Sequence, residues 1–100
     1  MDIYPGQIVY STAGRDKGKY FIVIERINDE YVYLSDGDIR RIENPKKKKS
    51  KHLRTVGKDV EQLVDKLKNQ QKITNAEIRK CLAAYAVELQ QHKQESYSRS

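Results

Sequence analysis

The amino-acid sequence predicts an α+β protein in which a small all-β antiparallel barrel is followed by an α-helical hairpin. Two observations lead to this prediction. The first half of the 100-residue chain contains short clusters of β-branched and aromatic residues, separated by turns rich in glycine and aspartate. Near Val56 the apolar residues change from strand-like clusters to helical spacing. With 37% apolar and 34% charged residues, the composition is that of a soluble domain.

The first half is expected to contain five strands. They are predicted at residues 7–11, 19–28, 31–35, 39–42 and 52–56. Residues 12–18 form a loop in which Gly14 and Gly18 are available for positive φ. Asp36-Gly37 predicts a type I′ hairpin turn into the fourth strand, and Asn44-Pro45 ends that strand. Because a unit of roughly 55 residues buries only about 60% of its unfolded surface, it is expected to need either a closed barrel or a second element packed on it, which the helical half can supply.

The second half is expected to form two amphipathic helices. Val60, Leu63, Val64 and Leu67 recur at helical spacing, and Thr74-x-x-Glu77 is a capping box that predicts the start of the second helix. Ile73 and Ile78 are placed for the accompanying hydrophobic staple. The second helix has its apolar stripe at Ile78, Cys81, Leu82, Tyr85, Ala86 and Leu89. The domain prediction is therefore a barrel over residues 1–56, two helices over 57–91 and a flexible polar tail over 92–100.

Positive charge is concentrated in one stretch of the chain. Residues 40–58 contain nine basic side chains against the single acid Glu43, a net charge of +8, whereas the whole chain carries +6. The remaining residues therefore sum to −2. Because only a localised field holds a polyanion in one place, the pattern indicates a partner that carries phosphates.

The sequence contains no arrangement typical of an enzyme. Asp36 and Asp38 flank a turn glycine, where aspartate is favoured for turn formation. Phosphate-binding loops, nucleophile elbows and metal-binding histidine pairs are missing from the sequence, so we expect no catalysis, no cofactor and no metal. The single Cys81 is expected to be an inert core thiol. Without an apolar run long enough for a signal peptide or a membrane span, a cytoplasmic protein is expected.

The first half resembles the KOW motif, a short glycine-centred element of ribosomal proteins and NusG-type transcription factors. The resemblance is carried by Gly6, Val9, Gly14, Lys17-Gly18-Lys19 and Val23. It continues through Val32-x-Leu34, Asp36-Gly37-x-Ile39-Arg40-Arg41, Pro45-Lys46 and Leu53, which are similar to the KOW-bearing large-subunit ribosomal protein family numbered fourteen (e-type) in archaea and eukaryotes. It covers roughly residues 4–55. Phe21 stands where many KOW motifs have another glycine, and the lysine run and the helices lie outside the pattern.

The resemblance implies an SH3-like barrel whose first loop contacts RNA, and the basic residues agree with this. Basic side chains flank Gly14 and Gly18, which shape the loop, and the lysine run is expected to be a flexible, extended connection. Because Arg40 and Arg41 are neighbours on a predicted strand, only one can share a surface with the loop, and the other is expected to pair with a nearby acid. The predicted RNA-binding residues are Arg15, Lys17, Lys19, Arg40, Arg41, Lys46, Lys47, Lys48, Lys49, Lys51 and Arg54.

Two tyrosines, Tyr31 and Tyr33, share one face of their predicted strand. They are candidates for stacking on unpaired bases, and the alternative is ordinary packing on a small barrel.

RNA binding, to ribosomal RNA or another structured RNA in the translation apparatus, is therefore the leading functional prediction. One alternative is an SH3-like protein-interaction module that docks on a transcription or translation factor. The other is a nonspecific DNA binder. The apolar helices leave self-association or a protein partner open, and no membrane partner is expected.

Overall fold

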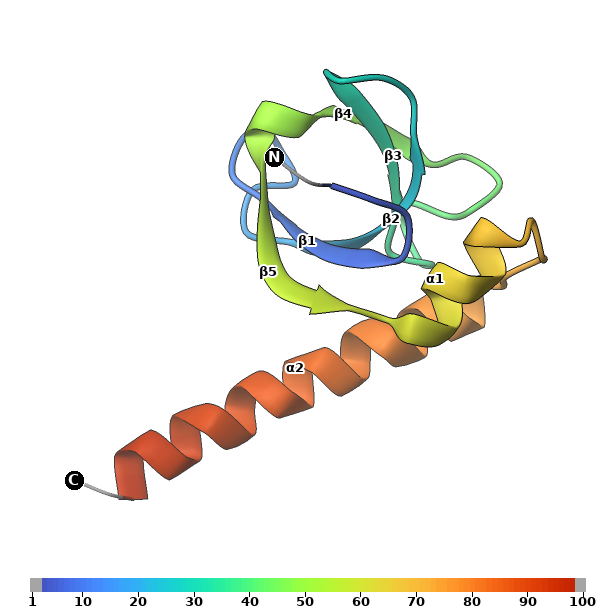
Figure 1. Ribbon diagram of the computed structural model, residues 1–100. Helices are drawn as coiled ribbons and strands as arrows, with labels where there is room; N and C mark the ends of the chain where they lie inside the picture. The colour runs from blue at the N-terminus through green and yellow to red at the C-terminus, as the bar shows by residue number, and fades with distance from the viewer. Residues whose placement is uncertain (1–2, 99–100) are drawn as a thin grey trace.

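Five antiparallel strands and two α-helices make up the described part of the chain (Figure 1). The structure is a computed structural model that describes the backbone of residues 3–98 and the side chains of residues 3–91. The elements are β1 (Gln7–Ser11), β2 (Tyr20–Arg26), β3 (Tyr31–Ser35), β4 (Lys46–Lys49), a short 3₁₀-helix η1 (Ser50–His52), β5 (Leu53–Asp59), α1 (Glu61–Lys68) and α2 (Asn75–Ser98). The α+β class predicted from the sequence is confirmed.

The strands form one sheet in the order β4-β3-β2-β1-β5, and every neighbouring pair is antiparallel. The sheet curves strongly in Figure 1. However, β4 and β5 remain its two edges, and no pairing joins them within residues 3–98. The predicted five-stranded antiparallel sheet is thus confirmed, whereas the closure of that sheet into a barrel is not.

The central strands are buried on both faces. Val9 and Phe21 point into the concave side of the sheet, while Ile8 and Ile22 point to the convex side. The concave core consists of Ile3, Val9, Phe21, Val23, Val32, Leu34 and Leu53. The convex core joins Ile8 and Ile22 to Leu63, Ile73 and Ile78 from the helical half. The helices therefore complete the core of the sheet, as expected for a unit too small to bury enough surface alone.

The second helix begins at the predicted capping box. The backbone N–H of Glu77 donates to Thr74 Oγ1 at 3.1 Å, and both staple residues, Ile73 and Ile78, are buried in the convex core. A hydrogen bond from Lys66 holds the pKa of Glu77 below its usual value. The helix continues to Ser98, so its backbone extends through most of the predicted tail. Side chains from residue 92 onward and the last two residues lie outside the described part.

The strand predicted at residues 39–42 is wrong, because this segment forms turns. The carboxylate of Asp36 accepts from the backbone N–H groups of Asp38 and Arg40, at 2.9 and 2.8 Å. The N–H of Ile42 donates to Asn75 Oδ1 at 2.8 Å. Side chains thus satisfy the backbone groups that a neighbouring strand would otherwise pair, and they hold the segment against α2.

Replacing Asn75 with alanine is expected to destabilise the protein by about 1–3 kcal/mol, because Asn75 is 8% exposed and the Ile42 N–H would lose its acceptor. Urea unfolding followed by far-UV circular dichroism would measure the change. The exposed Asn69, replaced in the same way, serves as the control and should shift the midpoint far less. Equal midpoints for the two variants would contradict this account of the segment.

The lysine run is an edge strand and not the flexible connection predicted from its charge. In β4, Lys46, Lys47, Lys48 and Lys49 lie opposite Leu34, Tyr33, Val32 and Tyr31 of β3, respectively. Hydrogen bonds to β3 satisfy the backbone N–H and C=O groups of β4 and hold it as a strand despite the repulsion between its lysines. The prediction from charge did not include these hydrogen bonds. A strand of lysines is also well suited to a sheet edge, because its charges discourage pairing with another chain.

Candidate nucleic-acid interface

The loop between β1 and β2 presents three exposed cations, Arg15, Lys17 and Lys19. Gly14 and Gly18 both have positive φ, 78° and 87°, as the sequence suggested. The N–H of Gly18 donates to Ser11 O at 2.9 Å, which closes the loop on the end of β1. The glycines therefore allow a tight bend that leaves the cationic side chains in solvent.

Lys48 joins this loop to the lysine strand. Its ammonium group donates to Ala13 O at 2.8 Å, beside Gly14. The N–H of Thr12 also donates to His52 O in η1, at 2.9 Å. The two basic elements predicted from the sequence are separated by about thirty residues, and these contacts make them neighbours.

The two adjacent arginines have acidic partners. Arg40 pairs with Asp16, a loop residue that is only 6% exposed, at 3.6 Å, and Arg41 pairs with Glu43 at 3.1 Å. A hydrogen bond from Asn75, together with Arg41, lowers the pKa of Glu43. Arg40 therefore shares a surface with the loop, and its guanidinium helps to hold the loop through Asp16. Arg41 pairs with a nearby acid, as expected.

Alternate lysines of β4 lie on different faces. Lys48 reaches the loop, whereas the Nζ atoms of Lys47 and Lys49 lie 4.7 and 6.0 Å from the centre of the Tyr31 ring. These are cation–π distances. Because β4 is an edge of the described sheet, a polyanion that crosses the edge can contact both faces. The Tyr31 ring is covered by these cations, while Tyr33 lies opposite Lys47.

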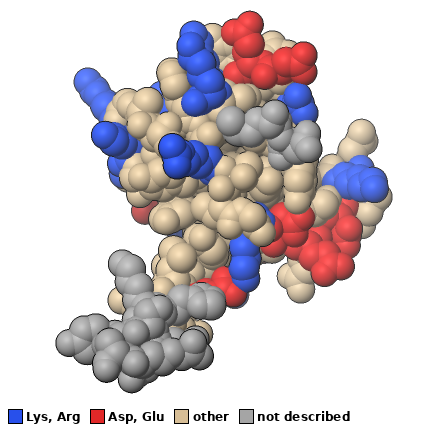
Figure 2. Space-filling view, turned by 60° about the vertical axis from the view of Figure 1, so that its left-hand side comes forward, with Lys and Arg blue, Asp and Glu red and all other residues tan. Residues whose placement is uncertain are grey.

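The remaining predicted cations lie on elements of the strand-rich half of the molecule. Lys46 opens β4, Lys51 is exposed in η1, and Arg54 is exposed on β5 opposite Tyr10. On the face in Figure 2, Lys and Arg side chains gather on the left of the strand-rich half, and acidic side chains are grouped at the top and lower right. The helices pack against β1 and β2, away from β4 (Figure 1). Within residues 3–91 they leave the loop and the lysine strand uncovered (Figure 1).

Replacing Lys48 with methionine is expected to shift the backbone amide resonances of residues 13–18, because the ammonium group that anchors Ala13 O is removed. Two-dimensional NMR of the labelled protein would report the change residue by residue. Lys46→Met is the matched control, because Lys46 lies on the same face of β4 and the described residues give its side chain no hydrogen bond. If both variants left the loop resonances unchanged, Lys48 would have no role in positioning the loop.

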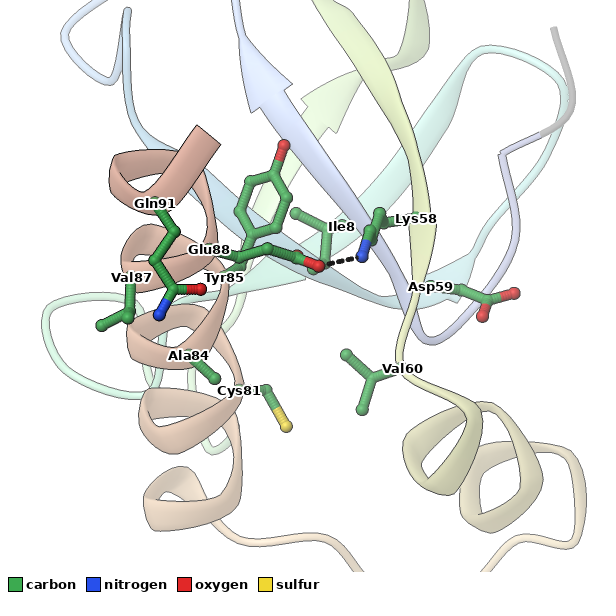
Figure 3. A pocket seen from close by; sticks show the side chains of 10 residues that line it. All are labelled: Ile8, Lys58, Asp59, Val60, Cys81, Ala84, Tyr85, Val87, Glu88 and Gln91. Carbon is green, nitrogen blue, oxygen red and sulfur yellow. Dashed lines mark hydrogen bonds and ion pairs between the residues drawn. The ribbon is translucent and has the colours of Figure 1, made fainter. Parts of the chain in front are cut away.

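A second surface was not foreseen from the sequence. A groove of about 470 Å³ lies between the end of β5 and α2, with Lys58 and Glu88 paired across it and Val87 at its side (Figure 3). Val87 is 54% exposed. Cys81 also lines this groove, and burial raises the pKa of its thiol. The raised pKa disfavours the reactive thiolate. Cys81 is only partly buried, so the predicted place in the core is not confirmed.

No protein-family model and no curated protein matches this chain. Among the described side chains, no group of three His, Cys, Asp or Glu is placed to hold a metal ion. Within residues 3–98, neither helix is both long and apolar enough to cross a bilayer. The candidate site therefore depends on the geometry and charge of the loop and of β4.

Proposed function

We propose that this protein binds RNA through phosphate contacts made by the β1–β2 loop and by β4. The observation that carries the proposal is the contact from Lys48 to Ala13, which brings two separate basic elements together. Arg15 and Lys17 are exposed on the loop, and Lys47 is exposed on β4. The three cations therefore lie on two elements that contact each other. Flexible cations around a tightly bent backbone suit phosphate oxygens, so the surface provides affinity more than sequence readout.

We further propose that the curved sheet is a KOW-like, SH3-like small barrel, and the strand order is the observation that favours this. Four consecutive strands lie side by side and β5 returns beside β1, an order that brings the two sheet edges toward each other as the sheet curves. In this proposal the RNA is ribosomal RNA or another structured RNA, and the protein works in the cytoplasm with the translation apparatus. Its role is binding and not catalysis.

Competition binding at several salt concentrations tests the proposal. With a labelled structured RNA, four or five neutralised phosphates predict a slope of log affinity against log salt of about −3 to −4. RNA should also compete better than DNA of the same sequence, if 2′-hydroxyls or A-form shape contribute. A salt-insensitive interaction would favour a protein-docking module, and equal competition by DNA would favour a nonspecific nucleic-acid binder.

A further inference from the structure

A cavity beside the lysine strand has a lining that phosphate binding does not explain. It has a volume of about 690 Å³ and lies between β2, β3, the turn before β4 and the end of α1. Its apolar side includes Tyr33, Pro45 and Leu67, and its polar side includes Glu25, Asn44 and Gln70. An apolar surface with a few convergent polar groups is typical of a ligand site.

The backbone around this cavity departs from regular structure at two places. The β2–β3 register shifts between Val23 and Glu25, so that Glu25 lies directly opposite Tyr33 on the same face. Gln70, just after α1, has a φ of 56° and is the one residue other than glycine with positive φ in the described chain. Gln70 follows the C-cap of α1, and the N–H groups of Gln70 and Gln71 donate to Leu67 O and Lys66 O at 3.2 and 2.7 Å, the pattern in which a left-handed residue commonly ends a helix. Both irregularities bring polar side chains to the cavity.

The chemistry of the lining favours a nucleobase over a phosphate. Glu25 is an acceptor that repels phosphate but accepts hydrogen bonds from N–H groups on a base edge. Asn44 and Gln70 carry amides that both donate and accept. Tyr33 offers a ring for stacking, in contrast to Tyr31, whose ring is covered by Lys47 and Lys49.

The cavity is also next to the proposed phosphate contacts. Tyr33 and Lys47 are direct partners in the β3–β4 ladder, and directly opposed side chains lie about 5 Å apart at their Cβ atoms. A nucleotide whose phosphate contacts Lys47 can therefore place its base against Tyr33.

We propose that this cavity binds a single unpaired base of the RNA, with guanine preferred. The base stacks on Tyr33, and the two adjacent N–H donors on the Watson–Crick edge of guanine face the Glu25 carboxylate. This inference rests on the proposed function and names the kind of RNA it selects, a structured RNA with an extruded base.

Two hairpin RNAs test the cavity, one with a single bulged guanine and one fully paired with the same stem. Wild-type protein should bind the bulged hairpin more tightly. Tyr33→Ala should weaken binding to the bulged hairpin roughly tenfold and leave binding to the paired hairpin unchanged. Tyr33→Phe keeps the ring and should bind both hairpins as the wild type does.

Exchanging the bulged guanine for uracil tests the role of Glu25. Wild-type protein should prefer guanine, and Glu25→Gln should remove most of this preference, measured as the ratio of the two affinities because loss of the carboxylate also removes a repulsion that acts on every RNA. If Tyr33→Ala weakened binding to both hairpins equally, or to neither, the cavity would not be a base site, although RNA binding would stand. If wild-type protein bound neither hairpin, the proposed function itself would be overturned.

Discussion

Replacing Lys47 and Lys49 together with alanine is expected to weaken RNA binding by roughly 10- to 50-fold at about 0.1 M salt. Each phosphate contact with a single strand contributes about 0.7 to the salt slope, so two lost contacts should also flatten the slope by about 1.4. Both ammonium groups lie over Tyr31 on the solvent side of β4, so their removal leaves the concave core intact. Filter binding across a salt series measures both effects.

A control for this variant must remove the same charge elsewhere. Lys68 in α1 and Lys80 in α2 are exposed, and neither has an ion pair among the described side chains. Their double replacement with alanine lowers the net charge equally and should change the affinity little. If the two double variants lost the same affinity, binding would depend on total charge, and the site on β4 would be wrong.

Replacing Gly6 with alanine is expected to destabilise the protein by roughly 3–4 kcal/mol. Gly6 has a φ of 93°, and a Cβ added there would lie 2.8 Å from the Cα of Val64 in α1. The strain of a left-handed backbone is thus added to a backbone clash that pushes α1 off the sheet. For a domain of this size the melting temperature should fall by roughly 12–32 °C, as measured by calorimetry.

Gly18 provides the matched control for Gly6. Its φ of 87° is similar, but a Cβ there would meet none of the described atoms within 4 Å. Gly18→Ala should therefore cost about 1 kcal/mol, the backbone strain alone. Equal losses at Gly6 and Gly18 would show that the contact with α1 contributes nothing.

The elements with strong local signals could be predicted from the sequence. Both β1 and β3 have the predicted bounds, and Thr74 caps α2, because β-branched alternation and a capping box act through neighbours along the chain. The prediction failed where distant side chains decide the backbone. Asp36-Gly37 is a hairpin signal by itself, but Asn75 and Arg79 of α2 bind the residues around it, and the strand does not form.

The candidate site shows the same division between local and distant interactions. The sequence by itself determined which cations belong to the bent loop and that the charge is concentrated, since both follow from residue order. Only the tertiary structure decided that the lysine run is a strand, that Lys48 reaches Ala13, and that Asp16 takes Arg40 as its partner. The physical reason is that charge repulsion along a short segment is a local property, whereas hydrogen bonds to β3 and to the loop exist only once the sheet has folded.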